Sequence, residues 1–223
     1  MQNGGHDSLD TEAIETSCAF CLHGSFATNI LKETDAFFLV ADHAPLVEGH
    51  ILIIPKRHFA CYGAVPAELD AELLALKREV QGFFARYYAP IVFWEHGIFR
   101  QTVFHAHLHC FPFGATEYNA TKSPYSLVVQ SQNDVRAWYT MYGYYFYMED
   151  RSNSLLFAPE TDRYLQVIKH VLWPGVSSRS LHNGWRSPQQ RYEQGAPLIR
   201  ATMDKWHEFQ RLGANYVDET SPR

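Results

Sequence analysis

The stretch that decides the fold runs His105-Ala-His-Leu-His-Cys-Phe111, and in it three histidines alternate with apolar residues. On a β-strand, alternate side chains point to the same face of the sheet. We therefore expect His105, His107 and His109 to project to one side, while the residues between them face the core. Three polar rings above a buried face favour a functional site. The alternatives are a strand that binds metal and histidines that are simply solvated.

Imidazole side chains suit chemistry at phosphorus. A neutral ring is a nitrogen nucleophile at pH 7, and it can also carry a proton. A neighbouring imidazolium can stabilise a phosphate oxygen electrostatically. The three histidines therefore predict a site in which one ring attacks phosphorus and the others donate hydrogen bonds.

The flanking sequence predicts an α+β fold, with an antiparallel sheet of about five strands that carries the histidines. From Pro66 to Tyr88, apolar residues recur at three- and four-residue steps, which is typical of a long amphipathic helix with a first-turn proline. Apolar and β-branched runs indicate strands at residues 36–41, 50–55, 91–94 and 103–111.

The pattern changes after a loop, and we place a boundary at about Thr116 to Ser123. We expect a disordered lead-in at residues 1–15, a domain with the histidines at 16–115, and an α/β extension at 116–223 that packs on it. The expected strands of the extension lie at residues 126–130, 138–148 and 154–158, and its helices at 161–172 and within 188–210.

Composition excludes several classes of protein. Hydrophobic residues make up 46% of the chain and charged residues 19%, as in a soluble globular protein. The formal net charge is −5 and basic residues do not cluster, so nucleic acid is not expected as the main partner. No apolar run approaches the ~20 residues of a membrane span, and no secretory signal is visible. Two of the four cysteines have a metal-ligand spacing, so we expect a reducing, cytoplasmic location.

The segment at 105–111 resembles the motif of the histidine-triad (HIT) family, His-φ-His-φ-His-φ-φ, where φ is apolar. Upstream, the run Gly49-His-Ile-Leu-Ile-Ile-Pro-Lys-Arg-His58 resembles the family's strand that ends in Pro-Lys-X-His. Gln101-Thr102 is similar to the family's Gln-Ser pair just ahead of the triad. The resemblance covers about Cys18 to Gly114, and it implies the HIT fold and a small nucleotide as the partner.

The resemblance implies a role for each residue around the phosphate. His107 would be the nucleophile that forms a covalent nucleotidyl-histidine. His109 and the amide of Gln101 would contact phosphate oxygens, and Thr102 would offer its hydroxyl to the same phosphate.

It also implies a nucleoside pocket. The carboxylate of Asp42 would bind the ribose hydroxyls, since it can accept two hydrogen bonds, and Phe38 and Val40 would line the base pocket. The alternative for Asp42 is a turn residue ahead of Pro45.

The sequence departs from the family at Glu95-His-Gly97, where many members have Asn followed by Gly. The spacing to Gln101 is also about one residue shorter than usual. Glu95 could still orient the ring of the nucleophile, and a carboxylate would raise its basicity.

Cys18-X-X-Cys21 is too short a motif to define a metal site alone, because a tetrahedral site needs two more ligands. The resemblance to zinc-containing branches of the triad family supplies them as His58 and His105. Four protein ligands would make the zinc structural. The alternative is a pair of free thiols on a mobile N-terminus.

The second half of the chain offers two further candidates. Tyr145, in the tyrosine-rich run that ends at Met148, could bind a phosphate or an acceptor, although such residues are more often half-buried in a sheet. Arg186, just ahead of Pro188, could grip a phosphate, and the alternative there is a capping turn.

These observations favour a nucleoside phosphate hydrolase that acts at the α-phosphate of a dinucleoside polyphosphate, a phosphoramidate or a similar compound. A nucleotidyltransferase is the first alternative, because the extension could hold an acceptor, although uridylyltransferases often replace the third histidine with Gln. A nucleotide sensor without turnover is the second, and DNA-end repair is disfavoured by the charge. Because many triad proteins complete their sheets across a two-fold axis, a homodimer is a further expectation.

Overall fold

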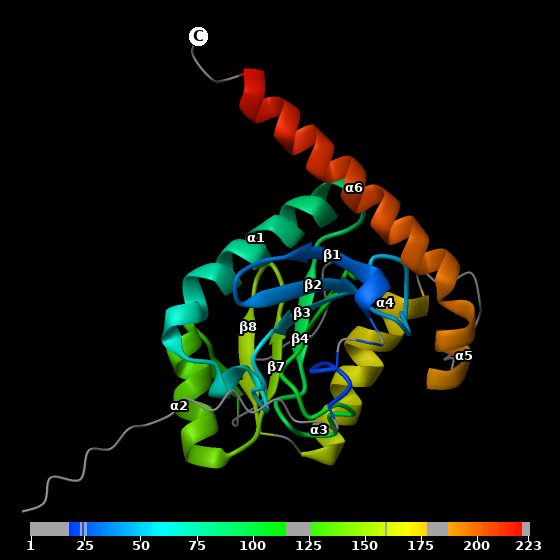
Figure 1. The fold of residues 1–223 in the computed structure, drawn as a ribbon. Coiled ribbons are helices and arrows are strands. Elements are labelled where there is room, and N and C mark those ends of the chain that lie inside the picture. Colours follow the sequence, from blue (N-terminus) through cyan, green and yellow to red (C-terminus); the bar gives the residue numbers. More distant parts are fainter. Residues whose placement is uncertain are drawn as a thin grey trace, which may run out of the picture.

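The computed structural model describes residues 18–22, 24, 26–114, 126–158, 160–177 and 187–219. Their centre is an antiparallel sheet of eight strands in the order β1-β2-β3-β5-β4-β7-β8-β6 (Figure 1). The strands are β1 (Ile30–Glu33), β2 (Phe37–Ala41), β3 (Ile51–Pro55), β4 (Val92–Glu95), β5 (Leu108–Phe111), β6 (Ser126–Val128), β7 (Phe146–Glu149) and β8 (Ser154–Phe157). The α+β class is confirmed, and the sheet is larger than the five strands expected.

The three additional strands come from the second half of the chain and continue the same sheet. β7 pairs with β4, so that Phe93 lies opposite Glu149 and Trp94 lies opposite Met148. Ion pairs also link the two halves of the chain: Lys77 lies 2.5 Å from Glu149, and Arg136 contacts Asp70 through both terminal guanidinium nitrogens. The extension is therefore integral to the sheet.

Helices cover both faces of the sheet. They are α1 (Asp70–Tyr87), α2 (Gln132–Tyr142), α3 (Thr161–Val167), which continues as a π-helical segment at Ile168–Leu172, α4 (Trp173–Ser177), α5 (Pro188–Gln194) and α6 (Ala196–Glu219); short 3-10 turns occupy Ala27–Asn29, Tyr62–Ala64 and Ala67–Leu69. In Figure 1, α1 and α6 lie on one side of the sheet and α3 and α4 on another. No described helix is both long and apolar enough to cross a membrane.

Helix α1 forms because its apolar residues recur on one face. It buries Leu73, Leu76, Val80, Phe83 and Phe84. Trp206 of α6 is fully buried and packs edge-on against Phe83, with 5.0 Å between ring centroids. The predicted start at Pro66 is early, because residues 67–69 form a 3-10 turn. These two helices leave the opposite face of β2, β3, β5 and β4 for a site.

The triad segment is only partly a strand. β5 begins at Leu108, so His105 lies in a bend and His107 in the irregular residues just ahead of the strand, and the predicted strand over 103–111 is too long. Alternate residues nevertheless face the core, since Ala106, Leu108 and Cys110 all belong to the cluster under α1, although His105 and His107 are buried as well. The segment is anchored by the backbone N–H of Ala106, which donates to Phe59 O at 2.6 Å.

The prediction of a strand over 138–148 is wrong. Residues 132–142 form α2, and the strand β7 begins at Phe146. Ser131 and Asp134 form a capping box at the start of α2, and Gly143, with φ of 76°, ends it. The strands near 126 and 154 and the helices near 161 and 188 are confirmed. The proposed lead-in at 1–15 and the proposed boundary lie outside the described residues.

Candidate active site

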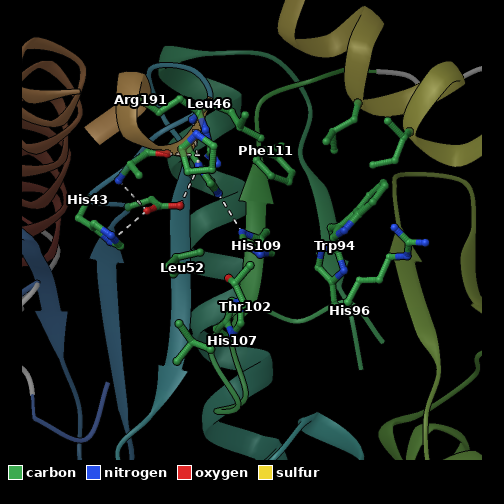
Figure 2. Close-up of a pocket in the computed structure, with 18 of the residues that line it drawn as sticks. His43, Leu46, Leu52, Trp94, His96, Thr102, His107, His109, Phe111 and Arg191 are labelled. Atoms are coloured by element: carbon green, nitrogen blue, oxygen red, sulfur yellow. Dashed lines mark hydrogen bonds and ion pairs between the residues drawn. The ribbon is translucent and has the colours of Figure 1, made fainter. Parts of the chain in front are cut away.

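A cleft of about 360 Å³ opens on the sheet face opposite α1. Strand pairing places Leu52 of β3, His109 of β5 and Trp94 of β4 side by side in one row. All three line the cleft, as does His107. Figure 2 shows the two histidines in the middle, with His43 and Arg191 on one side and Trp94 and His96 on the other. The triad therefore occupies the floor of a cleft with two sides.

His107 is held in one tautomer. Its Nδ1 lies 2.6 Å from the carbonyl oxygen of His105. A carbonyl can only accept, so Nδ1 carries the proton and Nε2 keeps its lone pair. Burial lowers the pKa of His107 from its usual 6.5, against the raising effects of the His105 carbonyl and Asp42. The ring is therefore neutral near pH 7, with Nε2 able to act as a nucleophile.

A buried chain of three residues supports the third histidine. Asp42 Oδ2 lies 3.1 Å from His50 Nδ1, and His50 Nε2 lies 3.0 Å from His109 Nδ1. Burial lowers the pKa of His50 to about 4 and that of His109 well below 6.5, so both rings are neutral near pH 7. Burial raises the pKa of Asp42, but the neighbouring histidines, the Ala44 N–H and the charge of Arg191 together lower it below its ordinary value, so the carboxyl is ionised near pH 7. Asp42 can therefore stabilise a proton that reaches His109.

His50 was quoted in the motif but given no role. It is 2% exposed and stacks on Phe111, with 4.4 Å between ring centroids. A sequence signal was available, because His50 is a polar residue directly ahead of the apolar run of β3. It is separated from Asp42 by a single loop.

Of the substrate-binding candidates, Asp42 and Thr102 line the cleft, whereas Phe38 and Val40 do not. Those two are buried in a cluster below it. The apolar wall on this side is made by three other residues, Phe20, Leu52 and Val103.

Gln101 does not line the cleft, because backbone groups occupy its amide. Its Nε2 donates to His105 O at 2.8 Å and to Ala60 O at 3.2 Å, and its Oε1 accepts from Ile98 N at 3.0 Å. Gln101 thus fixes the same carbonyl that orients His107. In this geometry it positions the nucleophile and does not face a phosphate.

Glu95 and Tyr145 are brought together, but away from the cleft. Glu95 accepts from Tyr62 N at 2.7 Å and from Tyr145 OH at 2.5 Å. Both side chains are buried, and burial raises the pKa of Glu95 to about 7. The orientation of His107 that was expected from Glu95 is provided by the His105 carbonyl. Arg186, the other candidate from the second half, lies outside the described residues.

The second half supplies walls of the cleft that the sequence did not reveal. Tyr164, Ile168 and Leu172 line it from α3 and the π-helical segment, and Pro188 and Arg191 line it from α5. Arg191 donates to Ala44 O at 2.9 Å. Nothing in the local sequence marks these residues, because only the long-range packing of the helices brings them to the triad.

The loop from His96 to Gln101 also lines the cleft, through His96 and Arg100. Gly97, Ile98 and Arg100 have positive φ values of 51°, 79° and 54°. Non-glycine residues in this region are strained, and such strain concentrates at functional sites.

Four predicted metal ligands meet beside the triad. The ligand atoms of Cys18, Cys21, His58 and His105 all lie within 4.8 Å of one another and could hold a metal ion. His105 Nδ1 is 3.4 Å from Cys18 Sγ and 3.5 Å from Cys21 Sγ, which is 3.3 Å from His58 Nδ1. His105 Nε2 lies 2.8 Å from Pro55 O. Its proton is therefore on Nε2, and the Nδ1 lone pair is available to a metal.

Comparison with known proteins gives matches that each cover about half of the chain. The family model described as "Protein similar to CwfJ C-terminal" matches residues 6–126. An uncharacterized HIT-like protein of Mycoplasma genitalium is 31% identical over 139 residues, or 53% of this chain and 96% of that one. An adenosine 5′-monophosphoramidase of Schizosaccharomyces pombe is 32% identical over 104 residues, or 46% and 78%. A zinc-bound histidine triad family protein of Mycobacterium smegmatis has 27% identity and a TM-score of 0.37 over 56% and 94%.

Proposed function

The chain belongs to the histidine-triad superfamily and to the family of proteins similar to the CwfJ C-terminal region, and from that membership we propose that it hydrolyses a nucleoside phosphate at the α-phosphorus. One observation carries the proposal: the 2.6 Å contact of His107 Nδ1 with the His105 carbonyl leaves Nε2 as a neutral nucleophile on the cleft floor. The phosphoramidase activity named for the fission-yeast relative is chemistry of this kind.

The reaction would take two steps. The Nε2 lone pair of His107 attacks the α-phosphorus, an N–P bond forms, and the bond to the leaving group breaks with its electron pair on that group. A water molecule then attacks the same phosphorus, and one of its protons passes to solvent. The N–P bond breaks, His107 recovers its lone pair, and the nucleoside monophosphate leaves.

His109 would contact a phosphate oxygen during both steps. Its Nδ1 faces His50, and a proton taken up at Nε2 would create an imidazolium beside the reacting phosphate. The carboxylate of Asp42, 3.1 Å from His50 Nδ1, would stabilise that charge through His50. His50 is therefore a positioning residue in this proposal, and His109 the group that contacts a phosphate oxygen.

The nucleoside would lie on the side of Asp42. Each Asp42 oxygen already has a partner, because Oδ1 accepts from Ala44 N at 2.9 Å and Oδ2 faces His50. A carboxylate oxygen has two lone-pair sites, so ribose hydroxyls can still bind. Phe20 and Leu52 offer an apolar wall for the base.

We propose zinc as the metal of the Cys18–Cys21–His58–His105 cluster. Zinc bonds of about 2.3 Å to sulfur and 2.0 Å to nitrogen place tetrahedral ligand atoms about 3.5 Å apart, and the contacts here are 3.3 to 3.5 Å. When bound, the ion would supply structural cross-linking and no open coordination position. His105 would then be fixed at its ring, and its carbonyl would be fixed against His107.

A transferase is the second candidate, and the extension favours it, because two of its helices line the cleft and could hold an acceptor. The two activities share the first step. The hydrolase and the transferase are distinguished by adding candidate acceptors, such as sugar phosphates. A transferase would form the nucleotidylated acceptor at the expense of free nucleoside monophosphate.

The test is turnover of adenosine 5′-phosphoramidate by wild type, His107→Ala and His207→Ala. His207 is an exposed histidine on α6, so it is a matched control. We expect His107→Ala to lower kcat by at least about 10³-fold, since removal of a nucleophile abolishes the covalent route, and the control to match wild type. A His107→Ala variant that folds and turns over at the wild-type rate would contradict the proposal. Tight nucleotide binding without any product would support a sensor.

A further inference from the structure

We propose that the β4 side of the cleft is a second subsite, built by the 96–101 loop and α3, which takes a leaving group with a planar ring and a phosphate of its own. This inference rests on the proposed function, because it needs the nucleoside on the Asp42 side and His107 at the α-phosphorus. No residue of the subsite was predicted from the sequence to bind substrate.

The strand order separates the two sides. His109 lies between Leu52 and Trp94 in the cross-strand row, and Asp42 follows β2 beyond Leu52. A group on the Asp42 side and a group on the Trp94 side are therefore divided by the triad histidines (Figure 2). A substrate whose α-phosphate sits over His107 and His109 must extend in both directions.

The wall of the β4 side is aromatic, and it is held rigidly. The ring of Tyr164 lies 5.7 Å from His96, 5.6 Å from Phe99 and 5.8 Å from Phe146, measured between centroids. Trp94 packs edge-on against Phe146 at 4.4 Å. Of these rings, Tyr164 lines the cleft and is half-buried, so it can offer a flat surface to a planar group at little cost in side-chain entropy.

Arg100 supplies the positive charge on this side. It lines the cleft, and its Cζ lies 5.4 Å from the Tyr164 ring and 5.6 Å from the Phe99 ring. Among the described residues that line the cleft, the one carboxylate is Asp42, which is on the other side. Within the described part of the chain, Arg100 forms no ion pair, so its charge can meet a phosphate.

Arg191 does not duplicate this role. It lies on the Asp42 side, and its guanidinium donates to the carbonyl of Ala44. Arg100, by contrast, is carried by a strained backbone with φ of 54° in the loop that follows β4. Its guanidinium lies over the Tyr164 ring, on the side of the cleft that α3 lines.

His96 adds an acceptor. Its Nδ1 lies 3.1 Å from Phe99 O, so this nitrogen carries the proton and Nε2 keeps a lone pair. Burial lowers its pKa to about 4, so the ring is neutral at pH 7. The subsite thus combines one cation, flat aromatic walls and one acceptor, which suits a nucleoside phosphate or an aryl phosphate better than ammonia or an amine.

The experiment uses four adenylates that differ in the leaving group on the α-phosphorus. Adenosine 5′-phosphoramidate releases neither a ring nor a phosphate, ATP releases pyrophosphate, the 4-nitrophenyl ester of AMP releases a ring, and diadenosine triphosphate releases ADP, which has both. We expect Arg100→Gln to lower kcat/KM for ATP and diadenosine triphosphate by about 10- to 100-fold more than for the phosphoramidate. Tyr164→Leu should lower kcat/KM for the two ring-bearing substrates by about 5-fold or more relative to the other two.

The control is Arg151→Gln, an exposed arginine in the turn between β7 and β8, which should match wild type on all four substrates. Equal losses on all four for Arg100→Gln, or no losses, would overturn the subsite. In parallel, calorimetry in a His107→Ala background compares binding of diadenosine triphosphate with binding of AMP. Arg100→Gln should weaken the first at least 10-fold more than the second, and equal effects would overturn the subsite. Because the binding arm needs no turnover, failure of the proposed hydrolysis is distinguished from failure of the subsite.

Discussion

Glu95→Gln should make the protein more stable at neutral and alkaline pH. Glu95 is 2% exposed, and burial raises its pKa from 4.5 to about 7, against the lowering effects of Tyr145 OH and Tyr62 N–H. Between these two pKa values the unfolded chain releases the proton while the folded chain keeps it. Wild-type stability therefore falls as pH rises through this window and levels off above pH 7.

The magnitude follows from the size of the shift. At 1.36 kcal/mol per pH unit, a shift from 4.5 to about 7 corresponds to about 3.4 kcal/mol over the whole window, of which about 2.5 kcal/mol falls between pH 5 and pH 8. In the Glu95→Gln variant the new side chain has no proton to lose, and its carbonyl could still accept from Tyr62 N. Its amide group could donate to the Tyr145 oxygen.

The assay is urea unfolding of wild type, Glu95→Gln and Glu208→Gln at pH 5 and pH 8. The free energy of unfolding of Glu95→Gln minus that of wild type should rise by about 2.5 kcal/mol between the two pH values. Glu208 is exposed on α6, so its variant should show almost no change. A Glu95→Gln difference that does not depend on pH would refute the assignment of a protonated carboxyl in the core.

Three further predictions concern the metal, the loop and the extension. Cys21→Ser should lose bound zinc, measured by native mass spectrometry, and lower Tm; full zinc occupancy in the variant would count against the four-ligand site. Gly97→Ala should cost at least about 2 kcal/mol of stability in urea unfolding, because φ is +51° and a Cβ would lie 2.5 Å from the Tyr145 ring, whereas Gly143→Ala, where a Cβ meets nothing within 4 Å, should cost less. A chain without residues 116–223 should fail to give a cooperative unfolding transition, because β7 would no longer cover β4; a sharp transition would show that the first half folds alone.

The sequence was most informative where chemistry and local structure coincide. Alternation over 105–111 indicated both the core face and the site face, and the Cys-X-X-Cys spacing with His58 and His105 led to four ligand atoms that do meet. The alternation is a short-range pattern, because successive side chains of an extended segment point to opposite faces. The two histidine ligands came from the family resemblance, since His58 and His105 lie far from the cysteines in the sequence.

The second half was less predictable for physical reasons. Its aromatic run has the composition of a strand, but the capping box at Ser131 and the positive φ of Gly143 select a helix. The residues that carry these signals, Ser131, Asp134 and Gly143, are visible in the sequence. The cleft walls from Tyr164 and Arg191 depend on where α3 and α5 pack on the sheet. The displacement of Glu95 from the nucleophile likewise follows from strand register, which turns its side chain to the face opposite Trp94.

The central claim is that His107 bonds to the α-phosphorus, and trapping that bond tests it most directly. Wild type in excess over adenosine 5′-phosphoramidate or diadenosine triphosphate is quenched in alkali, because P–N bonds hydrolyse in acid, and is then examined by intact mass and peptide mapping. We predict a mass increase of one adenylyl group on the peptide that contains residues 105–111, and none in His107→Ala. Product formed at equal rates by both proteins, without any adduct, would contradict the account.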